Sequence, residues 1–222
     1  MRPITQLLNF AIQSTFMETN EYLQQLTDIK AIIEKSTKFK ALSGLSGVLA
    51  GLYALTGAFF AQSIVRHSTS VVYYDVLNFQ FSADLLKLLA LAMATMILSI
   101  ATGLYFSALH AKKNGARLWT PAAKRVLLNF SVPMAVGGIF IVSAIAKGYL
   151  DLVAPFCLSF YGLALLSASN YTFTETKYLG FVVLTLGCIS LFFGGYGLYF
   201  WALGFGVLHI IYGAIMYNKY EK

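Results

Sequence analysis

A stretch without Asp, Glu, Lys or Arg runs from Tyr178 to Asn218, and its one histidine is His209. A bilayer core about 30 Å thick needs roughly 20 apolar residues per crossing helix, and soluble cores do not hold uncharged runs twice that long. Over the whole chain 58% of residues are hydrophobic and 11% are charged, so most of the sequence must face lipid or other helices. The sequence therefore predicts an integral membrane protein, with two crossings in this stretch alone.

Six apolar segments are long enough to cross a bilayer. They cover about residues 41–65, 86–109, 126–146, 150–169, 178–194 and 198–217. Gly194-Gly195-Tyr196-Gly197 can form a tight turn between the last two, because glycine adopts positive φ without steric cost, and Lys147-Gly148-Tyr149 can do the same between the third and fourth. The expected fold class is all-α: a polytopic membrane bundle of six transmembrane helices (41–222), whose second half forms two helical hairpins.

The basic residues predict how the bundle is threaded. Of the 16 Lys and Arg, three (Arg66, Lys87 and Lys147) fall on one side of a six-span topology and the others fall on the side of the termini. The positive-inside rule then places both termini in the cytoplasm, with the loop from Arg66 to Ala83 outside. The net charge of +7 is explained by this topology and by anionic lipid, so no nucleic-acid partner is expected. Because the first apolar run starts near residue 41, the first span, and not a signal peptide, is the expected insertion signal.

Residues 1–40 read as a cytoplasmic amphipathic helical segment. Apolar residues recur at three- and four-residue intervals, at Leu8, Ile12, Phe16, Tyr22, Leu26, Ile29 and Ile33. Such a stripe suits a helix that lies on the inner leaflet or covers the cytoplasmic ends of the bundle. It also suits a helix that docks a protein partner or a second subunit. The sequence leaves both interpretations open.

Small residues recur at helix-packing intervals inside the spans. In lipid, helices associate by close van der Waals contact and interhelical hydrogen bonds, so small residues four or seven apart mark helix interfaces. The residues with this pattern are Ser43, Gly47, Gly51, Gly180, Gly187, Gly206 and Gly213. Packing within one chain and a homo-oligomeric seam both account for them.

His209 lies near the middle of the last span, on the same predicted face as Ala202, Gly206 and Gly213. An ionisable residue at this depth is expected to face another helix. Its candidate partners in the other spans are Thr95, Ser99, Thr102, Tyr161, Thr185 and Ser190. Three roles fit: a neutral histidine bridging two helices, a proton-linked group, and a ligand contact. The candidate ligand or proton-linked set is His209, Tyr212, Thr95, Ser99 and Thr102.

The sequence holds no motif that identifies a reaction. Paired carboxylates, a nucleophile arrangement, a phosphate loop and a metal-ligand cluster are all missing, so neither catalytic residues nor a metal or cofactor are predicted. Cys157 and Cys188 read as small core residues, and Asp84 with Lys87 as a local ion pair. The expected function is non-enzymatic packing or partner binding in the membrane. A transporter or channel for a small solute or apolar ligand, using His209, is the alternative, and a membrane-embedded enzyme is third.

Several local sequences resemble one kind of membrane protein. They are Ser43-Gly44-Leu45-Ser46-Gly47, Tyr178-Leu179-Gly180, Gly194-Gly195-Tyr196-Gly197 and Phe205-Gly206-Val207-Leu208-His209-Ile210-Ile211-Tyr212-Gly213. Together they resemble a family of uncharacterised bacterial six-helix inner-membrane proteins, over most of the chain after residue 35. A weaker likeness links the glycine-rich hairpins to six-helix acid-resistance membrane proteins. The resemblance implies a fold and a membrane but no activity and no functional residues.

Overall fold

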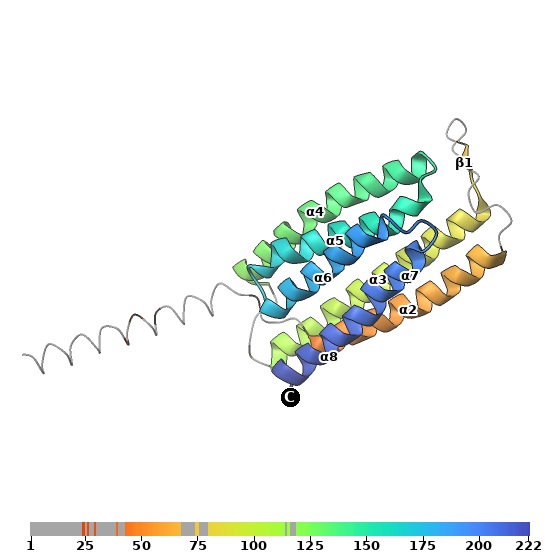
Figure 1. Cartoon of the computed structure of the whole chain (residues 1–222). Helices are drawn as coiled ribbons and strands as arrows, with labels where there is room; N and C mark the ends of the chain where they lie inside the picture. Colours follow the sequence, from red (N-terminus) through yellow and green to blue (C-terminus); the bar gives the residue numbers. More distant parts are fainter. Residues whose placement is uncertain are drawn as a thin grey trace, which may run out of the picture. The chain divides into compact units, whose positions relative to one another are not determined.

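The computed structural model describes residues 24, 26, 29, 39, 43–67, 74–75, 80–113, 115 and 119–222. The chain divides into two units, residues 1–38 and residues 39–222. Most of the amphipathic segment predicted over residues 1–40 lies outside the described residues. Figure 1 shows the second unit as a bundle of long helices.

Helices account for nearly all of the described part of the second unit. They are α2 (Gly44–His67), α3 (Ala83–Lys113), α4 (Pro121–Ala146), the 3₁₀ helix η1 (Leu150–Leu152), α5 (Val153–Ser169), α6 (Thr174–Ser190), α7 (Gly197–Trp201), the π-helix η2 (Ala202–Val207) and α8 (Leu208–Tyr220). Two short strands, β1 (Tyr74–Asp75) and β2 (Gln80–Phe81), pair antiparallel in the connection between α2 and α3. The all-α bundle predicted from the sequence is confirmed, with this small hairpin as an addition.

Five helical stretches are long and apolar enough to cross a membrane: α2, α3, α4, η1 with α5, and α7 through α8. The fifth predicted span, residues 178–194, corresponds to α6, which has 17 residues and is therefore about 26 Å long, slightly less than a bilayer core. It starts at Thr174, before the apolar run, and its first turn contains the polar residues Thr174, Glu175 and Thr176. By length and composition, these helices make the chain an integral membrane protein.

The glycine turns form where the sequence predicts them, but the last two spans are not each other's main neighbours. Gly195 (φ 80°) and Gly148 (φ 76°) occupy the left-handed region that favours glycine. After the Gly195 turn, α6 packs mainly on α5, whereas α8 packs mainly on α2. The bundle therefore has two groups, α4–α5–α6 and α3–α2–α8, and α7 with η2 contacts members of both (Figure 1).

The core lies between α5, α6 and the last span. Leu158, Leu165, Leu179 and Val183 are buried there, and Leu158 and Val183 have no exposed surface. Around this cluster pack partly buried hydrophobic side chains of the neighbouring helices: Phe130, Tyr161, Leu186, Phe200, Phe205, Leu208 and Tyr212. One of these side chains, Tyr161, is hydrogen-bonded to His209.

Candidate functional site

His209 is buried midway along the last helical stretch, Gly197–Tyr220, with 8% of its surface exposed. Its Nε2 lies 2.7 Å from the Tyr161 hydroxyl on α5, and its Nδ1 lies 2.9 Å from the carbonyl oxygen of Gly204 in η2. Among the partners that the sequence left open, Tyr161 is the one in contact. The histidine therefore bridges the last span to α5.

These two hydrogen bonds define how a neutral imidazole is protonated here. The Gly204 carbonyl can only accept, so Nδ1 carries the proton and donates to it. Nε2 is then a bare acceptor, and the Tyr161 O–H donates to it. Both ring nitrogens of His209 are thus satisfied within the bundle, as expected of a buried polar group.

Aromatic rings surround the Tyr161–His209 pair. The Phe205 ring lies 5.0 Å from the Tyr161 ring and 5.9 Å from the His209 ring, with the histidine stacked at 23°. Phe130 of α4 meets Tyr161 edge-on at 5.8 Å, and Trp201 lies 5.2 Å from Phe205. Such contacts favour defined ring orientations.

Tyr212, the other aromatic member of the candidate set, has a different partner. Its hydroxyl lies 3.0 Å from the Thr176 Oγ1 at the start of α6. Thr176 is buried, with 4% of its surface exposed, so this bond joins α6 and α8 in the interior. Tyr161–His209 and Thr176–Tyr212 are therefore two separate polar bridges to the last span.

The five hydroxyl residues considered as other partners of His209 lie elsewhere. Thr95 and Ser99 donate to carbonyl groups of their own helix α3, and the Thr102 hydroxyl donates to a tyrosine hydroxyl of α2 at 3.4 Å. Ser190 donates to a carbonyl of α6, and Thr185 is exposed. None of the five is hydrogen-bonded to His209. The structure thus separates Thr95, Ser99 and Thr102 from His209 and Tyr212.

Two of the predicted packing glycines in the last span face α2 and not α5. A Cβ at Gly213 would lie 2.4 Å from a backbone nitrogen of α2, and one at Gly206 would lie 2.4 Å from a leucine methyl of α2. From the other side, Cβ atoms at Gly47 and Gly51 would lie 3.1 Å and 2.6 Å from backbone atoms of the last span. The sequence placed Gly206 and Gly213 on the face of His209. The last span has α2 and α5 as neighbours, so these glycines contact α2 while the imidazole of His209 contacts Tyr161 of α5.

Gly180 and Gly187 lie in the contact between α5 and α6. A Cβ at Gly187 would lie 2.5 Å from the Ser159 hydroxyl and 2.6 Å from its backbone nitrogen, and a Cβ at Gly180 would lie 3.0 Å from a leucine of α5. Gly162 of α5, which the sequence pattern missed, is as tight, because a Cβ there would lie 2.6 Å from the Leu184 nitrogen. Small residues on both helices therefore allow their backbones to approach closely.

The C-terminal residues form contacts that the sequence pattern did not reveal. Glu221 accepts hydrogen bonds from the Gly44 backbone N–H and, at 3.2 Å, from the Ser43 hydroxyl. Its carboxylate caps the first turn of α2, where unpaired N–H groups favour a negative charge. Ser43, predicted as a packing residue, thus lies just before α2 and takes part in this cap. The two partners are 177 residues apart, so no local pattern could pair Glu221 with Gly44.

Glu175, at the start of α6, receives a second set of contacts from the C-terminal turn. Lys219 forms an ion pair with it, and the Tyr220 hydroxyl donates to its carboxylate at 3.1 Å. Partial burial acts to raise the pKa of the Glu175 carboxyl, but the hydrogen bonds from Lys219 and Tyr220 outweigh it and hold that pKa below its usual value.

This cluster predicts an acid-sensitive contribution to stability. Because the pKa of Glu175 is lowered on folding, its contribution is present above the unfolded value of 4.5 and is lost as the pH falls through the folded value. The thermal unfolding midpoint of the wild type should exceed that of Glu175→Gln by about 2 °C or less at pH 7, since the ion pair is at the surface. The difference should vanish in strong acid. A difference that is constant from pH 3 to pH 7 would contradict the assignment.

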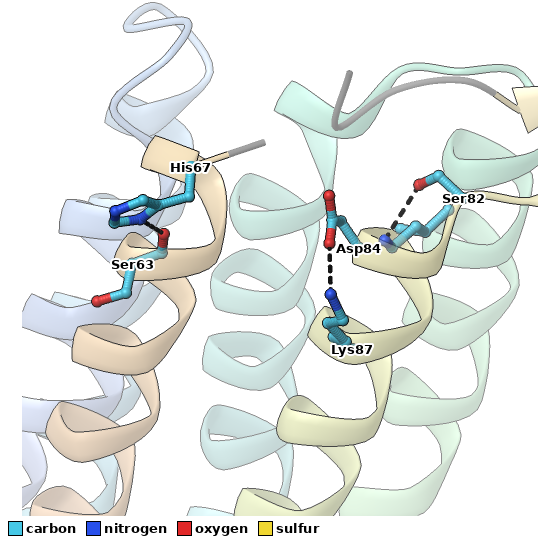
Figure 2. A network of polar contacts seen from close by, with 6 residues as sticks. Ser63, His67, Ser82, Asp84 and Lys87 are labelled. Carbon is cyan, nitrogen blue, oxygen red and sulfur yellow. Dashed lines mark hydrogen bonds and ion pairs between the residues drawn. The ribbon is translucent and has the colours of Figure 1, made fainter. Parts of the chain in front are cut away.

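A surface hollow of about 370 Å³ lies where α2 ends and α3 begins, away from the core. Ser63, Ile64, His67, Asp84 and Lys87 line it, and Figure 2 shows the Asp84–Lys87 ion pair at 2.9 Å and the His67 ring bonded to the Ser63 carbonyl at 2.7 Å. The local ion pair expected from the sequence is confirmed. None of the candidate residues around His209 lines this hollow.

The helices and their internal polar bridges define the class of this protein: an integral, multi-pass membrane protein of the helical-bundle type. Its buried polar side chains serve contacts between or within helices, and no buried side-chain nitrogen or oxygen among the described residues lacks a hydrogen bond. Nor do the described residues contain a group of three His, Cys, Asp or Glu able to hold a metal ion. No protein-family model, no curated protein and no solved structure matches this chain.

Proposed function

We propose that this protein is a non-enzymatic packing and partner-binding protein of a bacterial inner membrane, with both termini in the cytoplasm. The observation that carries the proposal is the saturated interior: His209 uses both ring nitrogens in contacts within the bundle. A transport path would need polar groups that are free to exchange partners with a solute. The distribution of Lys and Arg and the resemblance to uncharacterised bacterial six-helix proteins support the location.

The N-terminal unit is the proposed contact region. Leu26 and Ile29 are three residues apart in a helix and expose 63% and 53% of their surfaces. Residues at this spacing share one face of a helix, so the two side chains offer a common apolar surface. A protein partner, or a second copy of the chain, would cover such a surface by a helix contact.

A photo-crosslinking amino acid at Leu26 should therefore give a discrete protein adduct in intact membranes of full-length protein. The matched control is Gln24, which is also exposed and lies two residues away, on a different face of the helix. We expect the Leu26 adduct to be several-fold more abundant than the Gln24 adduct on a denaturing gel, and its mass to distinguish a second copy from another protein. Adducts of lipid alone at Leu26 would favour a surface-lying helix and contradict the proposal.

A small-solute or apolar-ligand transporter or channel is the second candidate. It is favoured by one observation: a π-helix and a Tyr–His pair occur together about midway along the last span. π-helices are rare and frequently lie at functional sites, and ionisable residues inside membranes often mark a solute or proton path. The two functions differ in what the removal of His209 does to membrane permeability.

A further inference from the structure

The π-helix η2 leaves one carbonyl in need of a new donor. The Leu208 backbone N–H donates to the Leu203 carbonyl, five residues back, and so not to Gly204, its partner in an ordinary α-helix. The Nδ1 of His209 donates to that Gly204 carbonyl at 2.9 Å. A side chain of the last span thus supplies a hydrogen bond that compensates for the wide turn in its own backbone.

Tyr161 connects this turn to a different helix. Its hydroxyl donates to Nε2 of the same imidazole at 2.7 Å, so α5 orients the ring that donates to Gly204. The nearest atom to a Cβ at Gly204 would be a Leu158 methyl at 2.3 Å, and at Gly206 it would be a Leu55 methyl at 2.4 Å. Both neighbours are side-chain methyl groups, and the backbone contact of η2 is with α2, where the Gly206 carbonyl would lie 2.6 Å from a Cβ at Gly51.

We propose that η2 is a hinge in the last span, held in its π form by the chain of hydrogen bonds from Tyr161 through His209 to the Gly204 carbonyl. When the His209–Gly204 bond is absent, the Leu208 N–H takes the Gly204 carbonyl and the turn becomes α-helical. The change from a π-turn to an α-turn rotates α7 by about 100° and shifts it by about 1.5 Å relative to α8, the rotation and rise of one helical residue. The hinge is a conformational device that operates whichever of the two functions above applies.

The orientation of α7 can be read from its contact with α5. A Cβ at Gly197 would lie 3.1 Å from the Ala154 Cβ, close to the separation found in disulfides of about 3.5–4.5 Å. Full-length protein in lipid vesicles would carry Ala154→Cys and Gly197→Cys, with Cys157→Ser and Cys188→Ser to remove the native thiols. The rate of disulfide formation under a mild oxidant then reports the fraction of the protein in the π form.

Two substitutions at position 209 each keep one of the two hydrogen bonds of the histidine and remove the other. In His209→Asn the amide nitrogen can take the place of Nδ1 and donate to Gly204, whereas in His209→Gln it reaches the position of Nε2 and faces Tyr161. We expect His209→Asn to keep close to the parent rate of disulfide formation. His209→Gln should reduce it about tenfold, the change in population that corresponds to one hydrogen bond. Equal rates in the two variants, whether high or low, would overturn the hinge.

A pair beyond the hinge provides the control. The Ser43 and Glu221 side-chain oxygens are 3.2 Å apart, so cysteines at these positions can be joined by a short bifunctional thiol reagent. Because α8 keeps its place in both forms, Asn and Gln at position 209 should leave this reaction unchanged. A loss of the Ser43–Glu221 reaction in His209→Gln would show a general loosening of the bundle and would also overturn the proposal.

Discussion

Replacing Gly213 by alanine is expected to destabilise the bundle by about 1–3 kcal/mol, the cost of forcing extra volume into a closely packed contact. A Cβ at Gly213 would lie 2.4 Å from the Val48 backbone nitrogen and 2.6 Å from the Gly44 carbonyl oxygen. Backbone atoms cannot turn aside as side chains can, so α2 and α8 must separate. The free energy of unfolding, measured by titration of the protein in mixed micelles with a denaturing detergent, checks this result.

Gly138→Ala is the matched control for that substitution. Gly138 is also in the interior of an apolar helix, α4, but no atom of the described residues lies within 4 Å of a Cβ at this position. Since alanine is the better helix former by about 1 kcal/mol, this variant should be as stable as the wild type or slightly more stable. Similar losses in both variants would mean that the effect comes from helix propensity and not from the contact between α2 and α8.

The membrane class and the positions of most helices could be predicted because hydrophobicity and turn chemistry are local. Residues 150–169 and 198–217 are apolar whatever lies beside them, and Gly195 adopts positive φ where a turn needs it. The start of α6 was less predictable. The helix begins at polar Thr174 and Glu175, before the apolar run that gives the hydropathy signal, because a helix can extend beyond the apolar core into the interface.

The partners of the candidate site depend on how each helix is rotated and on which helices are neighbours, and neither is a local property. Six hydroxyl residues on three spans were compatible with His209, and packing of the last span between α2 and α5 selected Tyr161. Gly206 and Gly213 were expected on the face of His209, but they contact α2 while its imidazole contacts α5. Glu221 contacts Gly44 only because α2 and α8 run side by side.

Replacing His209 by leucine is expected to lower the free energy of unfolding by about 1–3 kcal/mol. Leucine fills much of the same volume but removes the bond that holds the Gly204 carbonyl and leaves the buried Tyr161 hydroxyl without its acceptor. His67→Leu is the control, since His67 is exposed at the end of α2 and a surface change of this kind usually costs no more than about 0.5 kcal/mol. Equal losses in the two variants would contradict a bridging role for His209.

The same two variants distinguish the proposed function from transport. Proton flux into lipid vesicles can be followed with a trapped pH-sensitive dye under an imposed membrane potential. If His209 only joins the last span to α5, vesicles with wild-type protein, His209→Leu and His67→Leu should all match protein-free vesicles. A wild-type flux that disappears in His209→Leu and persists in His67→Leu would refute the packing and partner-binding role and favour transport. Because both ring nitrogens are already bonded within the bundle, we expect no flux that depends on His209.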